Sequence, residues 1–353
     1  MRKVGTDAGL AAVGIAGAGI FTKTREDLRS RRAAGFHGGM QFTYRNPERS
    51  TDPGRILDGA KSLVVGAWGY QRCDQTEPAT TSRPSGTVAR YARGDEYGAL
   101  RRALEQVADR LQVDGWKARV VLDDNALVDR AAAQRAGLGW FGRNTLLLLP
   151  ELGSWFVLGS VVTDAPLEQT APVGPSAPAE GCGPCKRCVT ACPTGALTSD
   201  GVLDARRCLA WLVQAPGTFP VEYRAAMGGR IYGCDDCQEV CPINRLADRR
   251  RPPRQAEPDA VSSVDLLGML EASDEELLDA HGRWYIAGRD PRHLRRNALV
   301  ALGNVGDGAD GATAAAVGRW VQSDDAMLAE HARWAAERLG RADLLMAPTG
   351  ADR

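Results

Sequence analysis

Histidine and lysine are scarce in this 353-residue chain, which contains four of the former and five of the latter. No charge of one sign dominates, because Lys+Arg and Asp+Glu both number 44, so no global field points to a polyanionic partner. No hydrophobic run approaches the length of about 20 residues that spans a bilayer. The N-terminal apolar stretch 8–21 is too short and too rich in glycine. The sequence predicts a protein without a membrane segment, and we expect it in the cytoplasm.

Aromatic residues make up only 6% of the chain, whereas apolar residues make up 44% and charged residues 25%. This composition is ordinary for a globular protein and excludes a disordered or collagen-like one. The length predicts two or three domains. Of nine cysteines, eight fall between Cys182 and Cys241. Because they are not spread along the chain, a secreted domain held by disulfides is not favoured.

The first part of the chain alternates strand-like and helix-like patterns. Short apolar runs predict strands at residues 11–17, 62–68, 118–122, 145–149 and 155–162. Apolar residues at helical spacing predict helices at 98–113 and 126–137, and a charged helix is expected at 24–34. We therefore predict an α/β core over residues 1–170.

Two further regions are expected after this core. The cysteine region occupies residues 171–250, and an Arg- and Pro-rich stretch at 245–259 is interpreted as an exposed linker. Residues 251–353 are helical in pattern. The segments 297–306 and 330–340 resemble the second helices of two stacked α-hairpins, which predicts a repeat-like helical cap.

The cysteine spacing is that of a bacterial ferredoxin. A C-x2-C-x2-C-x3-C-P run is followed by four further cysteines. In such runs the fourth cysteine ligates the other cluster, which predicts two [4Fe–4S] clusters. The first cluster would use Cys182, Cys185, Cys188 and Cys241. The second would use Cys192, Cys208, Cys234 and Cys237.

Two structural zinc sites are the alternative. Pairs of C-x2-C do bind zinc, but tetrahedral zinc requires neither the third cysteine of the run nor the Cys-Pro endings. No histidine lies between residues 182 and 241 to complete a mixed site. The pattern favours iron–sulfur clusters and leaves Cys73 as an ordinary thiol.

Four longer stretches resemble the cobalamin-dependent epoxyqueuosine reductases. They are DARRCLAWL (204–212), MGGRIYGCDDCQEVCPIN (227–244), RRNALVALGN (295–304) and the block at 121–159 that contains AGLGWFGRNTLLL and GSWF. The resemblance runs in order over most of the chain, from GGMQFTYRNPER (38–49) to HARWA (331–335). The block at 121–159 makes it far more specific than the ferredoxin run alone.

The resemblance implies a cobalamin-binding α/β core related to reductive dehalogenases, a two-cluster ferredoxin-like module and a C-terminal HEAT-like helical cap. It implies reduction of the epoxide of epoxyqueuosine, at the wobble position of tRNA, to the alkene of queuosine with release of water. Electrons would pass from the two clusters to cobalamin. A tRNA with a queuosine-type anticodon and an external low-potential electron donor would be the partners, and we expect a monomer.

The proton for the departing oxygen is assigned to Asp123, which follows the predicted strand 118–122. A carboxyl group donates a proton at neutral pH only where its pKa is raised. The resemblance implies the same role for Asp123, with Arg130 assisting. The alternative is that Asp123 and Asp124 are both N-caps of the following helix. We keep the capping role for Asp124.

Binding residues follow from the same resemblance. Asp123 and six other residues are expected to contact cobalamin: Asn144, Leu147, Leu158, Leu209, Asp235 and Asp236. For the three leucines, packing in a hydrophobic core is an equal alternative. Arginine suits phosphate through its planar, forked donor group, and six arginines are expected to contact tRNA: Arg206, Arg207, Arg224, Arg230, Arg295 and Arg296.

The chain departs from the family pattern at three positions. Ser50 replaces the second arginine of a PERRADP-like stretch, Gly98 replaces the histidine of a GRDYH-like motif, and Pro216 stands where a lysine is usual near the RNA. These changes leave the clusters and Asp123 intact but bear on the substrate. The alternatives are a corrinoid reductase acting on a small molecule and a non-catalytic electron carrier of ferredoxin type.

Overall fold

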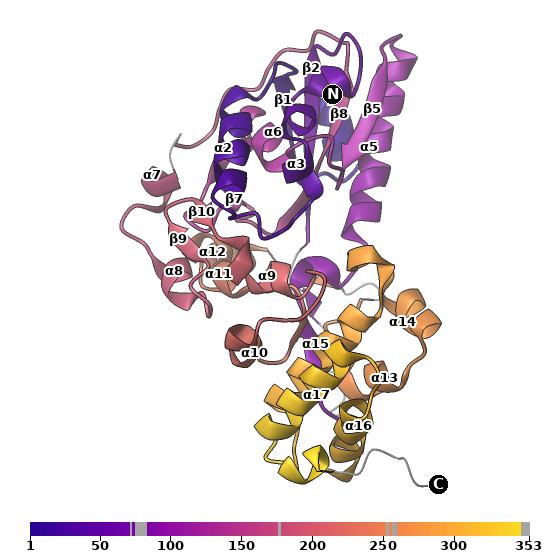
Figure 1. The fold of residues 1–353 in the computed structure, drawn as a ribbon. Coiled ribbons are helices and arrows are strands. Elements are labelled where there is room, and N and C mark those ends of the chain that lie inside the picture. The colour runs from indigo at the N-terminus through magenta and orange to yellow at the C-terminus, as the bar shows by residue number, and fades with distance from the viewer. Residues whose placement is uncertain (71–72, 75–82, 176–177, 252–253, 256–259, 347–353) are drawn as a thin grey trace. The chain divides into compact units, whose positions relative to one another are not determined.

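The computed structural model describes residues 1–70, 73–74, 83–175, 178–251, 254–255 and 260–346 (Figure 1). The chain divides into two compact units. The core unit comprises Met1–Cys73, Asp95–Arg206 and Asp236–Arg254, and the helical unit comprises Asp74–Gly94, Arg207–Asp235 and Gln255–Arg353. Each unit joins stretches that are distant in sequence. The division into three consecutive domains at residues 170 and 250 therefore stays a prediction.

A four-stranded sheet forms the centre of the core unit. Its order is β1 (Ala12–Gly17), β2 (Ser62–Gly69), β8 (Phe156–Thr163) and β5 (Ala118–Leu122). Four of the five predicted strands form this sheet, but all three pairings are antiparallel, whereas α/β folds have mainly parallel sheets. The sequence pattern did not distinguish these cases because β2 and β8 are buried along nearly their whole length.

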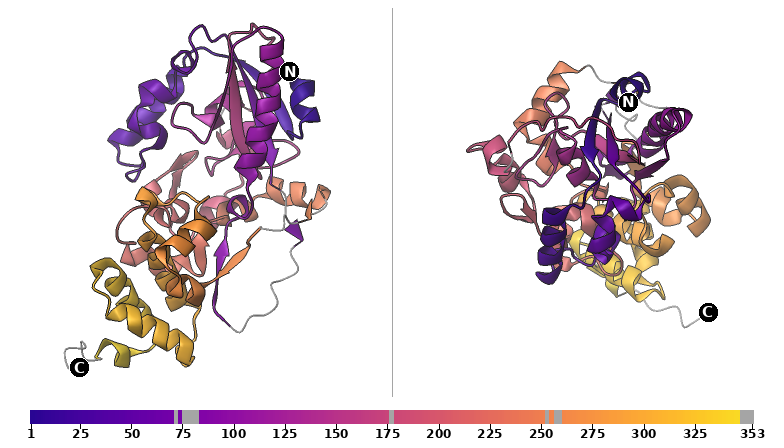
Figure 2. Two further views of the ribbon diagram at one scale, coloured as in Figure 1. Left: turned by 90° about the vertical axis from the view of Figure 1, so that its right-hand side faces the viewer. Right: turned by 90° about the horizontal axis from the view of Figure 1, so that it is seen from above.

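Helices cover both faces of this sheet (Figures 1 and 2). On one face α5 (Glu96–Val113) approaches so closely that a Cβ atom on Gly159 would lie 2.6 Å from the Leu104 side chain. On the other face, a Cβ on Gly14 would lie 2.1 Å from the carbonyl oxygen of Ala136, which ends α6 (Asp129–Arg135). The remaining N-terminal helices are α1 (Arg2–Asp7), α2 (Thr22–Ala33), α3 (Phe42–Arg45) and α4 (Pro47–Ser50).

Two elements are shorter than their sequence patterns predicted. The helix expected at 126–137 begins only at Asp129. Of the strand expected at 145–149, only β7 (Leu147–Leu148) forms, and it pairs with β6 (Trp140–Phe141).

The cysteine region adds short elements to the core unit. They are α7 (Pro178–Cys182), α8 (Arg187–Ala191), β9 (Leu197–Ser199), β10 (Val202–Leu203), α11 (Asp236–Glu239) and α12 (Pro242–Arg250). The prediction of an exposed linker at 245–259 is wrong at its start, because residues 245–250 continue α12. Residues 252–253 and 256–259 lie outside the described residues. Two further short strands are β3 (Cys73–Asp74) and β12 (Arg254–Gln255).

The helical unit contains a three-stranded sheet and most of the C-terminal helices. The sheet order is β11 (Arg230–Tyr232), β4 (Ser85–Val88) and β13 (Ser263–Asp265). The helices are α9 (Leu209–Leu212), α10 (Val221–Met227), α13 (Leu266–Glu271), α14 (Asp274–His281), α15 (Arg292–Val305), α16 (Gly311–Val321) and α17 (Ala326–Arg338). Helices α15 and α17 confirm the two helices predicted at 297–306 and 330–340. Among the described residues, no helix is long and apolar enough to cross a membrane.

Candidate active site

Asp123 lies in a strained turn directly after β5. Its backbone φ is +48°, a left-handed conformation that is uncommon for a residue with a side chain. The next residue, Asp124, accepts a hydrogen bond from the backbone N–H of Ala126 at 2.8 Å. Asp124 therefore closes a turn and does not cap α6, whose N-cap is Val128. The capping prediction for Asp124 is wrong because the helix starts three residues after this turn closes.

Three acidic side chains surround this turn. Although the Asp123 carboxyl group is accessible to solvent, partial burial and the charge of Asp124 raise its pKa. Burial and the charge of Asp123 raise the pKa of Asp129 well above its usual value. One carboxylate oxygen of Asp129, Oδ1, is buried without a hydrogen-bond partner among the described residues. At Asp123 and Asp129 the surroundings therefore shift the equilibrium toward the protonated carboxyl group.

Tyr97, in α5, faces the same acidic group. Burial raises the pKa of its hydroxyl, and the charges of Asp123 and Asp129 raise it further. Tyr97 is therefore a neutral hydroxyl beside the proposed acid. Sequence reasoning missed both Tyr97 and Asp129. Tyr97 directly precedes Gly98 in the same motif, and Asp129 directly precedes Arg130. Their position next to predicted site residues was the only sequence feature that could have indicated them.

Arg130 borders a large cavity of the core unit. Its guanidinium group is exposed and makes a 3.4 Å contact with the carbonyl oxygen of Thr145. The cavity measures about 920 Å³, and both residues line it together with aromatic side chains such as Phe36 and Phe141. Thr145 has a φ of +66°. A hollow with apolar and aromatic walls and a few polar groups is typical of binding sites for organic molecules. Asp123 is not among the residues that line this cavity.

Six of the eight cysteines of the region belong to the core unit. Burial and the charges of Cys182, Cys241 and Cys185 raise the pKa of the Cys188 thiol. Burial raises the pKa of Cys241 as well, and Cys182 and Cys185 add to it. These four thiols lie close enough to repel one another as thiolates, and they are the four that the spacing assigns to one cluster.

The other four cysteines are divided between the units. Cys192 accepts a hydrogen bond from the backbone N–H of Ala196 at 3.2 Å. Cys237 is in α11 of the core unit, whereas Cys208 and Cys234 belong to the helical unit. Within the described residues, no three His, Cys, Asp or Glu side chains are arranged to hold a single metal ion. The side chain of Cys73 lies outside the described part of the chain.

A buried polar network fixes the loop that carries Cys241. Asn244, three residues later, accepts a hydrogen bond from the Ser154 N–H at 2.7 Å and donates one to the Gln238 carbonyl at 2.9 Å. A Cβ atom on Gly153 would lie 2.2 Å from the Asn244 side chain. The last cysteine is thus held against the turn that precedes β8.

The residues expected to contact cobalamin are mostly engaged within the protein. Leu147, Leu158 and Leu209 are 1%, 7% and 2% exposed and pack in hydrophobic cores, which supports the core-packing alternative for their side chains. Asn144 is 4% exposed, and its amide makes a 3.4 Å contact with the Cys237 carbonyl. In the helical unit, Asp235 accepts a hydrogen bond from the Arg90 N–H at 2.7 Å. Asp236 is partly exposed and begins α11.

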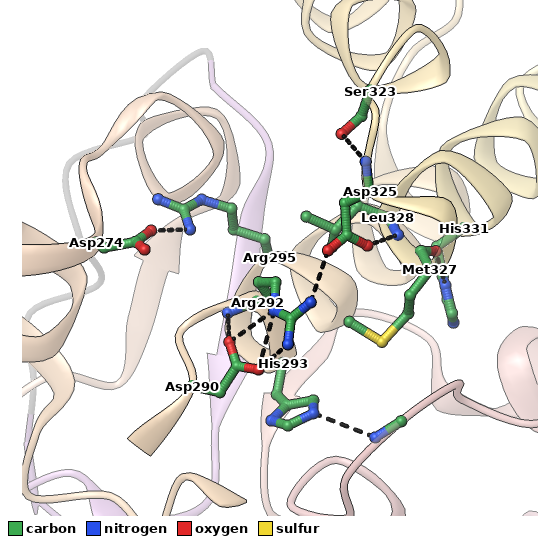
Figure 3. Close-up of polar contacts among 11 residues, drawn as sticks. Asp274, Asp290, Arg292, His293, Arg295, Ser323, Asp325, Met327, Leu328 and His331 are labelled. Carbon is green, nitrogen blue, oxygen red and sulfur yellow. Dashed lines mark hydrogen bonds and ion pairs between the residues drawn. The ribbon is translucent and has the colours of Figure 1, made fainter. Parts of the chain in front are cut away.

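Three of the six arginines expected to contact tRNA are buried, which argues against contact of their side chains with phosphate. Arg224, Arg295 and Arg296 are 1%, 6% and 0% exposed. Arg224 donates to the Phe219 carbonyl and pairs with Glu330 at 2.7 Å. Arg295 pairs with Asp274 (Figure 3). Burial of these guanidinium groups is possible because internal acceptors replace water, and the sequence pattern gave no sign of that.

The other three arginines are more accessible. Arg206 is exposed and forms a two-pronged ion pair with Asp204. Arg207 is partly exposed. Arg230 is also partly exposed and donates to the Met227 carbonyl at 2.8 Å. These three stay candidates for phosphate contact.

The positions that depart from the family pattern have clear local structures. Ser50 is fully buried and donates to the Thr43 carbonyl at 3.0 Å, so no cation is presented there. The Gly98 N–H is capped by Asp95, the N-cap of α5, at 3.0 Å. Pro216 is exposed in the loop between α9 and α10.

Comparisons with known proteins place these features in context. Residues 181–244 match the family described as a 4Fe-4S double cluster binding domain, and residues 50–124 match the family described as epoxyqueuosine reductase QueG, DUF1730. The chain is 35% identical over 311 residues to an epoxyqueuosine reductase of Lactococcus garvieae, covering 87% of this chain and 86% of that protein.

Solved structures resemble it as well. One is a crystal structure of epoxyqueuosine reductase with an epoxyqueuosine-modified tRNA stem loop, at a TM-score of 0.84 and 29% identity, covering 96% of this chain and 88% of that one. Another is the Bacillus subtilis enzyme with an aspartate-bearing catalytic loop swung out of its active site. It has a TM-score of 0.83 and 28% identity and covers 97% of this chain and 91% of that one.

Proposed function

The chain belongs to the epoxyqueuosine reductase family and is an oxidoreductase, and from that premise we propose that it reduces epoxyqueuosine in tRNA to queuosine with Asp123 as the proton donor. The observation that carries the proposal is the raised pKa of Asp123 in a strained turn after β5. The catalytic loop named for the Bacillus subtilis relative also bears an aspartate.

The reaction takes two electrons and two protons, converts the epoxide to an alkene and releases its oxygen as water. Asp123 would give one proton to the departing oxygen, and solvent would provide the other. Asp124 helps to keep Asp123 protonated, because a neighbouring negative charge disfavours ionisation. Arg130, exposed at the rim of the cavity, would orient the developing oxyanion by charge-assisted hydrogen bonds.

The cysteines fit two [4Fe–4S] clusters, since eight thiols are the donor set that two such clusters require. Cys182, Cys185, Cys188 and Cys241 would hold one, and Cys192, Cys208, Cys234 and Cys237 the other. When bound, the clusters supply electrons one at a time from an external low-potential donor. The mutual repulsion of the first four thiols supports their grouping.

Cobalamin would supply a strongly reducing metal centre. The cavity of about 920 Å³ beside Arg130 and Thr145 is of a size that suits part of such a group. Its aromatic wall suits an apolar macrocycle or its tail. Asn144 and the backbone near Leu147 lie next to Thr145 in sequence and are the proposed points of contact. Arg206, Arg207 and Arg230 are the proposed contacts for the tRNA backbone.

The decisive experiment compares Asp123→Asn with Asp124→Asn. The full chain is reconstituted anaerobically with iron, sulfide and cobalamin, reduced, and given tRNA bearing epoxyqueuosine, and the nucleosides are identified by mass. We expect the Asp123 variant to be slower by roughly 10²- to 10⁴-fold, the usual contribution of a general acid. Asp124→Asn keeps the turn, because asparagine also accepts the Ala126 N–H, and it should stay active.

The pH dependence separates the two roles further. Activity requires protonated Asp123, so it should fall as pH rises through the raised pKa of that group. Asp124→Asn removes the charge that helps to raise this pKa, so the fall should move to lower pH. Equal rates for wild type and Asp123→Asn would refute the proton donor. Absence of queuosine from a loaded wild-type enzyme would refute the substrate, and conversion of the free nucleoside would favour a small-molecule reductase.

A further inference from the structure

Arg143 is a buried cation beside the first cysteine of the ferredoxin run. It follows β6 in the core unit, and its side chain is 8% exposed. One end of the guanidinium group, Nη1, pairs with Asp200. The other, Nη2, donates to the carbonyl oxygen of Gly183 at 2.6 Å.

The backbone of Arg143 also approaches the cysteine itself. Its N–H donates to the Sγ atom of Cys182 at 3.5 Å, within the range of hydrogen bonds to sulfur. Because Gly183 directly follows Cys182, the guanidinium group and the N–H contact the same loop. A hydrogen bond and a positive charge therefore converge on one candidate cluster ligand.

The counter-ion does not cancel this charge fully. Asp200 is 44% exposed, so water screens its negative charge, whereas Arg143 is almost wholly removed from water. The Nε–H of Arg143 is buried and has no hydrogen-bond partner among the described residues. A positive field is therefore left toward the Cys182 loop.

We propose that Arg143 raises the reduction potential of the [4Fe–4S] cluster held by Cys182, Cys185, Cys188 and Cys241. In the one-electron reduction the cluster gains one negative charge, and a nearby fixed cation stabilises that form more than the oxidised form. Hydrogen bonds to the cluster sulfurs act in the same direction. The role of Arg143 is electrostatic, and it rests on the cluster assignment in the proposed function.

The test is a redox titration with dithionite, followed by electron paramagnetic resonance, on the full chain with both clusters reconstituted. Arg143→Gln should lower the reduced-to-oxidised ratio of one cluster by up to about tenfold at a fixed potential, which is ~59 mV for one electron. Asp200→Asn should shift the same signal in the opposite direction, because it leaves the cation unpaired. Arg143→Lys should stay near wild type.

Arg187→Gln is the matched control. This exposed arginine lies between Cys185 and Cys188, and its loss changes the net charge equally. Because water screens its charge, the shift should be clearly smaller than for Arg143→Gln. Equal shifts in the two variants would mean that charge near the run acts without regard to burial, which would overturn the specific role of Arg143.

The remaining outcomes separate the two proposals. If Arg143→Gln keeps its iron content and both potentials, the inference is overturned. If Arg143→Gln loses iron, the test passes to Asp200→Asn, because that variant retains Arg143. An unchanged cluster potential in Asp200→Asn would then overturn the inference. If Cys182→Ser keeps both cluster signals unaltered, the cluster assignment in the proposed function fails instead.

Discussion

Arg143 and Arg296 are both buried, but the two units of the molecule use them in different ways. Arg143 of the core unit pairs with a carboxylate, and its Nε–H has no hydrogen-bond partner in the described part of the chain. Arg296 of the helical unit is 0% exposed and donates to the carbonyls of Leu212, Val213, Ala215 and Gly217 and to the Asn297 side chain. The first arrangement leaves the positive charge an electrostatic influence on its surroundings, whereas the second uses the donors to hold four backbone carbonyls and the Asn297 side chain.

The loop held by Arg296 is fastened by two histidines as well. His293 accepts the Gly217 N–H and His331 accepts the Phe219 N–H, both at 3.1 Å (Figure 3 shows both side chains). Burial and the charge of Arg224 lower the pKa of Arg296 to about 10, which still leaves it charged at neutral pH. The comparison teaches that a buried arginine next to family motifs is not by itself evidence of a phosphate contact.

The largest expected effect on stability comes from removing the guanidinium group of Arg296, whose forked set of N–H donors holds the loop between α9 and α10. Arg296→Met would leave buried carbonyl groups without donors, and we expect a loss of about 3 kcal/mol or more in unfolding free energy, measured by urea unfolding. Arg292→Met, on the same helix but with an exposed ion pair, is the control and should change little. Arg296→Lys sharpens the comparison, because it restores the charge without the fork.

We expect Arg296→Lys to restore only a small part of the lost unfolding free energy, whereas Arg143→Lys should preserve the reduction potential of the cluster. Full rescue by Arg296→Lys would show that charge, not donor geometry, holds the loop between α9 and α10. The contrast between the two arginines would then be wrong.

Acid should loosen the same loop by a smaller amount. Burial lowers the pKa of His331 to about 4, below the value of about 6.5 in an unfolded chain. Between these values the unfolded chain binds a proton that the folded chain does not, so stability should fall by up to about 3 kcal/mol as pH drops from about 7 to about 4.

His331→Gln tests this, because glutamine can accept the Phe219 N–H without titrating. Urea midpoints measured across this pH range should fall less steeply in the variant than in wild type. A residual slope is expected from His281, whose pKa is lowered to about 4 by burial and by Arg283. An identical slope in the two proteins would contradict the assignment to His331.

The smallest expected effect on stability concerns Asp325, which contacts the exposed Arg292 of α15. Asp325 caps α17 by accepting the Leu328 N–H at 3.0 Å, and it also pairs with Arg292 at 2.9 Å (Figure 3). Asp325→Ala should cost about 1 kcal/mol through loss of the cap. Asp325→Asn keeps an acceptor for the cap and should be near wild type by thermal unfolding. A large loss in the asparagine variant would show that the surface ion pair matters more than exposed pairs usually do.

Several features of the candidate site could be predicted from the sequence because they depend on local order. Cysteine spacing indicates ligand geometry whatever surrounds it, and the residues matched by the double-cluster family include all eight cysteines. The strands at 62–68 and 118–122 formed where their apolar runs indicated. Asp123 directly follows the second of these, so its place at a strand end was visible as well.

Other features depended on contacts between distant segments. Asp129 and Tyr97 join Asp123 only because α5 and α6 both pack on the sheet. The same packing withdraws water and raises the carboxyl pKa values. The predicted cap at Asp124 failed because backbone geometry after β5 forms a turn before α6 begins.

By itself, the sequence determined the family, the candidate cluster ligands and the positions of the main strands, because each follows from residue type and spacing along the chain. Only the tertiary structure decided the antiparallel order of the sheet, the burial of Arg143, Arg224 and Arg296, and the surroundings that raise the pKa of Asp123. These properties depend on which atoms replace water around a group, and folding brings those atoms from segments more than a hundred residues apart, as when Arg224 meets Glu330.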